Sequence, residues 1–184
     1  MHWTGLDGTA PVIAIGYEFP PVEVLVTREM IRAYAAASHD FNPLHLDDDW
    51  MKSADFGPTR FGSVIAHGLM TYSLVTRMLT DVVYPLGGWH ERCEMRFTAP
   101  VLPGDTVRTA GRVTNVRRMG DLLRYAASVQ ARKEDGTMVA TGDAMGYVPA
   151  AALPGGDERN PDTVATRRAL AELAAEGDGP VAGG

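Results

Sequence analysis

Cysteine is almost absent from this chain of 184 residues, which contains one, Cys93. A single cysteine excludes an intrachain disulfide framework and a four-thiolate metal site, so we expect a reducing compartment and a cytoplasmic protein. No stretch approaches the roughly 20 consecutive apolar residues that a membrane helix needs. Residues 1–9 also lack a basic region followed by a long apolar run, so neither secretion nor membrane insertion is predicted.

Positive charge is scarce as well. The chain has 17 Lys and Arg against 23 Asp and Glu, a formal net charge of −6. It therefore offers phosphate backbones and acidic membranes no large basic field, and we expect neither a nucleic-acid nor a membrane partner. The length is enough for one domain with a tail, but not for two domains of ordinary size.

The composition changes near Ala150. In residues 150–184, 18 of 35 residues are Ala, Gly or Pro, and large apolar side chains are rare. We therefore predict one domain over residues 1–149 and an acidic tail over 150–184, with one short helix at 163–176.

Hydrophobic periodicity predicts the elements of the domain. A strand is expected over residues 12–19, and Thr27 is placed to cap a helix over 28–37. A longer helix is predicted from a mostly apolar stripe with spacings of four and three residues. The stripe consists of Ile65, Leu69, Tyr72, Thr76, Leu79 and Val83.

After Pro85 and two glycines the period changes to two, which is typical of strands. Strands are predicted at residues 92–99, 106–116, 122–132 and 138–148, as a four-stranded antiparallel meander. Asp135-Gly136 is a hairpin signal because both turn positions are expected to need positive φ. The small residues Ala140, Gly142, Ala144 and Gly146 would let a helix or second sheet approach, or suit a sharply curved edge.

This order of elements predicts an α+β hot-dog fold, in which an antiparallel sheet wraps around one long central helix. An ordinary α+β sheet with a helix across it fits the pattern too. A single sheet of this kind leaves an edge and a face exposed, so we expect the chain to form a homodimer.

The segment after the first helix carries the main chemical signal. Pro43 holds Asn42 extended, so Asp40 and His45 can meet across a rigid loop and orient a water molecule between them. Asn42 can stiffen this loop through an Asx turn. The alternative is an ordinary turn with His45 at the surface.

A second signal is His67-Gly68, at the predicted start of the long helix. The free N–H groups of a helix N-terminus can bind a ligand oxygen, and Gly68 leaves room for one. Alternatively, Gly68 serves close packing and His67 is a local cap. A metal site made of His39, Asp40, His45 and His67 is conceivable, but nothing in the spacing requires it.

The run Asp40-Phe41-Asn42-Pro43-Leu44-His45, followed by His67-Gly68-Leu69, resembles the MaoC-like, hydratase-2 family of (R)-specific enoyl-CoA hydratases. The likeness extends more loosely over residues 12–148. It implies a dimeric hot-dog lyase of fatty acid metabolism that reversibly hydrates a trans-2-enoyl-CoA thioester to a (3R)-3-hydroxyacyl-CoA. It also implies that the acyl-CoA substrate is used without a metal or other cofactor.

The resemblance also implies residue roles. Asp40 and His45 would be the acid/base pair that activates water and supplies the α-carbon proton, and the Gly68 amide would bind the thioester oxygen. Substrate binding is assigned to Asn42, which would also support the geometry of the pair, and to His67 and Thr76. Apart from the resemblance, the segment 47–61 with its aromatic residues is expected to cover the acyl pocket, although these side chains could equally belong to the core.

Three positions depart from the family pattern. His39 stands where Gly is usual and would add a titratable neighbour to the pair, Ala37 replaces a small aliphatic residue, and Met51 replaces Ala or Ser. Two other functions remain open. One is a non-catalytic hot-dog partner of a heteromeric hydratase, and the other is a thioesterase, although the long helix offers no carboxylate between Ser63 and Thr80.

Overall fold

The computed structural model describes residues 13–54 and 61–150. Its helices are α1 (Arg28–Ser38), α2 (Pro43–Leu46), α3 (Asp48–Ser53) and α4 (Gly68–Val83), followed by the 3₁₀ turn η1 (Tyr84–Leu86). Its strands are β1 (Glu18–Phe19), β2 (Glu23–Leu25), β3 (Trp89–Phe97), β4 (Thr106–Met119), β5 (Leu122–Lys133) and β6 (Met138–Pro149). The predicted helix at residues 163–176 lies outside the described residues.

The N-terminal part confirms the first helix and corrects the first strand. The Thr27 hydroxyl accepts a hydrogen bond from the Met30 N–H at 3.3 Å, so α1 begins with the predicted cap. The strand expected over residues 12–19 is interrupted because Gly16 has φ +89° in a turn in which the Tyr17 N–H donates to the Ala14 carbonyl. Short strands β1 and β2 therefore pair with β4 in its place.

The sheet is antiparallel in the order β1-β4-β5-β6-β3, and β2 pairs with β4 beside β1. Strands β4, β5 and β6 form a meander, but the predicted four-stranded meander is wrong. The chain crosses from β3 to the far side of the sheet, so β3 pairs with β6 rather than with β4. Within the described residues, β3 is one edge of the sheet.

The hairpins that join β4 to β5 and β5 to β6 form, the second with a different turn from the predicted one. Met119 pairs with Leu122 across Gly120-Asp121, where Gly120 has φ +63°. At the β5–β6 hairpin only Gly136 has positive φ, and the Lys133 N–H donates to the Thr137 carbonyl. A longer loop that needs one left-handed residue thus replaces the expected two-residue turn.

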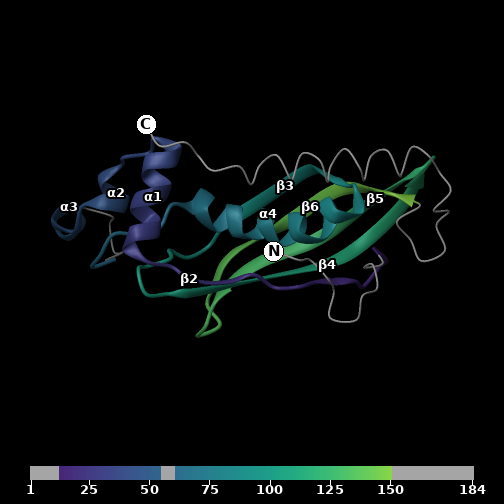
Figure 1. Cartoon of the computed structure of the whole chain (residues 1–184). Helices are drawn as coiled ribbons and strands as arrows, with labels where there is room; N and C mark the ends of the chain where they lie inside the picture. Colours follow the sequence, from purple (N-terminus) through teal and green to yellow (C-terminus); the bar gives the residue numbers. More distant parts are fainter. Residues whose placement is uncertain (1–12, 55–60, 151–184) are drawn as a thin grey trace.

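Helix α4 packs along one face of the sheet (Figure 1). The predicted stripe is rotated from the true buried face: Leu79 and Val83 are buried, but Tyr72 and Thr76 are half-buried and Leu69 is 60% exposed. The buried side chains are those of Met70, Thr71, Leu74, Val75, Met78, Leu79, Val82 and Val83. Ile65 precedes the helix, which begins at Gly68, so it is not part of the helix face.

The small residues of β6 serve strand packing more than helix packing. A Cβ atom on Gly142 would collide with the backbone carbonyl of Glu94 on β3, and one on Gly146 would meet the Trp89 carbonyl and the Tyr125 ring. Helix α4 instead approaches β4 at Gly111, where the Met78 methyl group lies 2.7 Å from the place of a Cβ atom.

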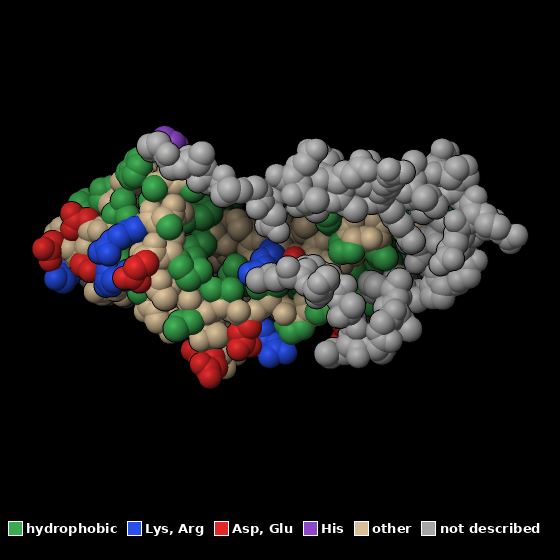
Figure 2. Space-filling model, viewed as in Figure 1, with side chains coloured by type: hydrophobic (Ala, Val, Ile, Leu, Met, Phe, Trp, Pro, Cys, Tyr) green, Lys and Arg blue, Asp and Glu red, His purple; other side chains and the backbone are tan. Residues whose placement is uncertain are grey.

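Helices α1, α2 and α3 gather at one end of the sheet, beside the start of α4 (Figure 1). Figure 2 shows acidic and basic side chains concentrated at that end, next to a hydrophobic surface. No helix in the described part of the chain has the length and apolar character needed to cross a membrane. The antiparallel sheet around one central helix confirms the predicted α+β hot-dog fold.

Candidate active site

His45 lies in the short helix α2, whose beginning is fixed by Asn42 and Pro43. Asn42 caps the helix by accepting the Leu44 N–H at 3.1 Å, and Pro43 occupies the first turn, where no N–H is needed. The His45 side chain is buried, and its Nδ1 lies 2.7 Å from the Ile65 carbonyl oxygen. A carbonyl can only accept, so Nδ1 carries the hydrogen, and Nε2 of the neutral ring holds a free lone pair.

Asp40 lies in the tight connection between α1 and α2. Its Oδ1 accepts the Asn42 N–H at 3.3 Å, an Asx turn that stiffens this loop beside the predicted one made by Asn42. Its Oδ2 lies 4.0 Å from Nε2 of His45 and 3.9 Å from Nε2 of His67. The carboxylate is about half exposed, so solvent can reach the face it shares with the two imidazoles.

His67 precedes α4, and Gly68 is the first residue of that helix, as predicted. The His67 ring is buried and stacks on His45 with ring centroids 3.7 Å apart. Its Nε2 donates to the Asp40 carbonyl oxygen at 3.1 Å. Its Nδ1 has no hydrogen-bond partner among the described residues. His67 thus joins the start of α4 to the Asp40 loop.

A cavity of about 460 Å³ adjoins these groups. The Phe97 ring forms the wall of the cavity next to Gly68, because it lies 3.2 Å from the position that a Cβ atom at that glycine would take. The lining residues are Leu44, His45, Phe61, Ile65, Ala66, Gly68, Thr71, Phe97, Thr98, Ala99, Pro100 and Val101. The cavity therefore brings His45 and Gly68 to one apolar space, with Asp40 bordering it through its contact with His45.

The environment favours the neutral form of His45. Burial lowers the pKa of His45 below its ordinary value of 6.5, and the adjacent His67 ring lowers it further. The hydrogen bond to Ile65 and the charge of Asp40 act in the opposite direction without cancelling the effect. His45 is therefore suited to accept a proton at Nε2 near neutral pH.

Thr76 is the predicted site residue that the structure does not bring to the others. It lies two turns along α4 from Gly68, about 12 Å by the helix rise, and its hydroxyl donates to the Ser73 carbonyl at 3.1 Å. Thr71 is the polar α4 residue in the cavity lining, and sequence reasoning missed it. The signal was its position one turn after Gly68, on the buried face of the helix.

Asp40, His45 and His67 could each offer one ligand atom to a metal ion, with these atoms within 4.8 Å of one another. Two features oppose this use. Nε2 of His67 already donates to a carbonyl, and the stacked imidazoles lie nearly parallel, with an interplanar angle of 26°. Their lone pairs would have to turn before both could reach about 2.0 Å from one ion.

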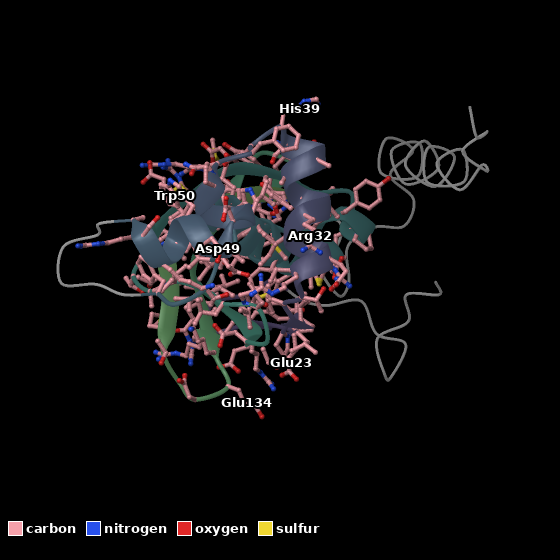
Figure 3. All side chains as sticks on the ribbon, turned by 90° about the vertical axis from the view of Figure 1, so that its left-hand side faces the viewer. Glu23, Arg32, His39, Asp49, Trp50 and Glu134 are labelled. Atoms are coloured by element: carbon pink, nitrogen blue, oxygen red, sulfur yellow. The ribbon has the colours of Figure 1, made fainter. Side chains whose placement is uncertain are left out.

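The departures from the family pattern have local explanations. His39 ends α1 with φ 57° and ψ 25°, a left-handed conformation that suits glycine best. Its ring is exposed, contacts Phe41 edge-on and points outward (Figure 3), so it is not the titratable neighbour of the pair that we expected. Met51 is buried in α3. Of the expected pocket cover, Phe61 lines the cavity, and residues 55–60 lie outside the described residues.

Comparisons with known proteins agree with the fold and show the family. A sequence model of the family described as "MaoC like domain" matches residues 13–135. An (R)-specific enoyl-CoA hydratase of Aeromonas caviae is 29% identical over 119 residues, 65% of this chain and 84% of that protein. The 3-hydroxyacyl-thioester dehydratase Z of Mycobacterium tuberculosis is 33% identical over 103 residues, 53% of this chain and 64% of that protein.

Among solved structures, an (R)-hydratase of A. caviae involved in PHA biosynthesis superimposes with a TM-score of 0.65 at 26% identity. The superposition covers 74% of this chain and 98% of that one. The family match extends from before β1 to the β5–β6 turn and includes every residue of the candidate site. The chain therefore belongs to the MaoC-like domain family.

Proposed function

We propose that this protein hydrates trans-2-enoyl-CoA thioesters to (3R)-3-hydroxyacyl-CoA and catalyses the reverse dehydration. One observation carries the proposal: Asp40 Oδ2 and His45 Nε2 lie 4.0 Å apart beside a cavity that Gly68, at the start of α4, also lines. The relatives named as an enoyl-CoA hydratase and a 3-hydroxyacyl-thioester dehydratase support the same class of reaction.

The spacing of the acid/base pair suits a water molecule. A distance of 4.0 Å is too long for a direct hydrogen bond, but one water can lie about 2.8 Å from both atoms. The lone pair at His45 Nε2 accepts one of its hydrogens, and the Asp40 carboxylate accepts the other. The water is thereby oriented and becomes more nucleophilic.

Hydration then transfers one proton in each direction. The water oxygen bonds to the β-carbon as His45 takes its proton, and the electrons of the double bond move toward the thioester oxygen. The α-carbon receives a proton from the Asp40–His45 pair, which restores the thioester and the starting proton count. Because water and proton come from one side of the double bond, addition is syn.

Negative charge on the thioester oxygen needs a donor. The Gly68 N–H belongs to the first turn of α4, where amides have no partner within the helix and the helix dipole is positive. A donor of this kind contributes about 3–4 kcal/mol to a developing oxyanion. A side chain in place of Gly68 would contact the Phe97 ring, so close packing against Phe97 is a second reason for glycine at this position.

The other predicted binding residues take supporting roles in this proposal. Asn42 and His67 hold the loop and the Asp40 backbone through the bonds described above. Thr71 replaces Thr76 as the α4 hydroxyl beside the substrate, because Thr71 lines the cavity.

We also propose that the active form is a homodimer. Strand β3 is an edge of the sheet within the described residues, and Trp89 and Phe97 on it are about half exposed. Leu69, at the adjacent start of α4, is exposed too. An unpaired edge with large apolar side chains is a surface that a second copy can cover. Gel filtration of the purified chain tests this, and a monomer at micromolar concentration would contradict it.

The activity is tested with crotonyl-CoA and a longer trans-2-enoyl-CoA. Loss of the enoyl absorbance reports hydration, and an (R)-specific 3-hydroxyacyl-CoA dehydrogenase reports the product's configuration. Release of free CoA thiol, measured in the same samples, separates thioesterase activity. We expect enoyl loss, an R product and no thiol release. Thiol release with an intact double bond would contradict the proposal.

The catalytic pair is tested by Asp40→Asn and His45→Ala. Each variant should keep the fold and the dimer, because Asp40 is half exposed and the buried His45 ring contributes one side-chain hydrogen bond, to Ile65, and its stacking on His67. Each should lose most of the hydratase activity. Activity close to wild type in either folded variant would remove that residue from the proposed mechanism.

A further inference from the structure

Three consecutive aspartates, Asp47 to Asp49, have three different environments. Asp47 caps α3 by accepting the N–H groups of Asp49 and Trp50, both at 2.9 Å. Asp49 is 91% exposed and pairs with Lys52 in its own helix. Asp48 instead contacts two distant parts of the chain, at the start of α1 and in the segment before α4.

The contacts of Asp48 form a compact network. Arg28 forms a bidentate pair with Asp48: Nη1 lies 2.8 Å from Oδ2, and Nη2 donates to Oδ1 at 3.2 Å. Oδ1 also accepts the Val64 N–H at 3.0 Å and the Ser63 hydroxyl at 3.3 Å. The Ser63 hydroxyl is itself bound by Arg28 at 3.0 Å. The hydrogen bond from the Val64 N–H lowers the pKa of Asp48 most, and Arg28 lowers it further. The carboxylate is therefore charged at neutral pH.

The segment that Asp48 holds leads directly into the candidate site. After Val64, the Ile65 N–H donates to Leu44 at 3.1 Å, and the Ile65 carbonyl accepts Nδ1–H of His45 at 2.7 Å. The next residue, Ala66, donates to Val101 at 2.8 Å. His67 and Gly68 follow. The Ile65 carbonyl, which selects the His45 tautomer, is therefore one residue from the amide that Asp48 binds.

We propose that Asp48 is a positioning residue: by binding the Val64 amide, and with Arg28 anchoring it, Asp48 places the Ile65 carbonyl that keeps the hydrogen of His45 on Nδ1. The segment is held at three successive amides, those of Val64, Ile65 and Ala66, and Asp48 binds the first of them. Without this anchor the Ile65 carbonyl moves, and the His45 hydrogen is divided between Nδ1 and Nε2. Rings that carry it on Nε2 have no lone pair there to accept a proton from water.

The test compares Asp48→Ala with Asp49→Ala, which removes a neighbouring carboxylate that has no contact with the site segment among the described residues. Figure 3 shows Asp49 on α3. Nitrogen-15 NMR of the histidine rings reports the His45 tautomer without any substrate. We expect a single Nδ1–H tautomer in the wild type and in Asp49→Ala, and a mixture in Asp48→Ala.

A kinetic readout rests on the proposed function. With crotonyl-CoA, Asp48→Ala should lower kcat by about 10- to 100-fold, which is the scale for a displaced catalytic group. Its KM should stay within about twofold, because Asp48 does not line the cavity. Asp49→Ala should match the wild type in both constants.

Asp48→Asn separates positioning from general destabilisation. It keeps an acceptor for Val64 but loses the charge, and bonds to a charged acceptor are about twice as strong. It should show a smaller tautomer change than Asp48→Ala, and it decides the question if Asp48→Ala does not fold. A wild-type His45 spectrum in the folded variants, whatever their melting temperature, overturns the inference. A changed spectrum in a chain whose wild type hydrates no enoyl-CoA upholds the positioning and rejects the proposed function.

Discussion

The sheet with α4 and the end formed by α1, α2 and α3 are held together in different ways. In the sheet, neighbouring strands are joined along long registers, such as Val107–Met119 with Leu122–Lys133, and buried and exposed residues alternate. At the site end, single polar contacts join residues 20 or more positions apart, as in His45 with Ile65 and His67 with Asp40. We therefore expect the sheet to keep its structure when one of its many contacts is lost, whereas the geometry of the site depends on each of its few polar contacts.

The sharpest test of this difference compares two histidines. His45→Gln removes the proposed base in the site, and His90→Gln removes a histidine of β3 that bonds Thr80 at 2.8 Å, outside the cavity lining. We expect His45→Gln to lower kcat by about 10² to 10⁴-fold, the range for general acid/base catalysis. His90→Gln should stay near the wild type. Steady-state kinetics with crotonyl-CoA measures both, and equal losses would show that the two regions are not functionally distinct.

A second test examines the sheet itself. Gly142→Ala places a methyl group against the Glu94 backbone carbonyl, which can move only with β3, so we expect a loss of about 1–3 kcal/mol in the free energy of unfolding. Gly111→Ala mainly meets the mobile end of Met78 and should cost less than about 1 kcal/mol. Urea unfolding of both variants checks this. A larger loss in Gly111→Ala would mean that the helix contact, not the strand contact, limits this part of the core.

The sequence was sufficient for the parts of the fold that repeat. The alternation of apolar and polar residues over 106–148 predicted the bounds of β4, β5 and β6 within a few residues, because every second side chain of a strand lies on the same face of the sheet. Strand order was not predictable in this way. Pairing of β3 with β6 depends on closing the sheet around α4, which no local pattern records. The helix stripe failed for a related reason, since Leu69, a large side chain near the start of α4, faces the surface rather than the core.

The site was predictable as a set of residues but not as a geometry. Pro43 and Asn42 indicated a stiff loop, and Gly68 indicated a helix start, because each has a strong local preference. The stacking of His67 on His45 and the contact of Asp48 with Val64 could not be predicted, since both depend on how distant segments cross. Thr76, which was assigned from the family resemblance, does not line the cavity, because it lies two turns along α4 from Gly68.

The pH dependence of stability gives a further comparison of the two regions, through His45 and His90. Burial lowers the pKa of both His45 and His90. Unfolded histidines titrate near 6.5, so below that pH the unfolded chain binds more protons than the folded chain, and stability falls as pH drops toward the folded pKa values. Each Gln variant should reduce this acid-side loss.

Activity should separate the two histidines in the same pH range. The acid limb of kcat/KM for the wild type should have its midpoint below 6.5, since neutral His45 is the active form. His90→Gln should leave that midpoint in place. Thermal unfolding and kinetics between about pH 5 and 8 measure both effects, and a midpoint above 6.5 would contradict the environment described for His45.

The smallest expected effect lies within the end formed by α1, α2 and α3, at the C-terminus of α1. His39 holds a left-handed conformation that costs a residue with a Cβ atom about 1–2 kcal/mol, although histidine tolerates it better than most. Glycine removes this cost but loses more chain entropy on folding, by about 0.5–1 kcal/mol. His39→Gly should therefore raise the free energy of unfolding by about 0.5 kcal/mol, and His39→Ala should not. Because the His39 ring is exposed and points outward (Figure 3), both variants should keep the wild-type kcat, and a change in the pH profile of either would place His39 in the site after all.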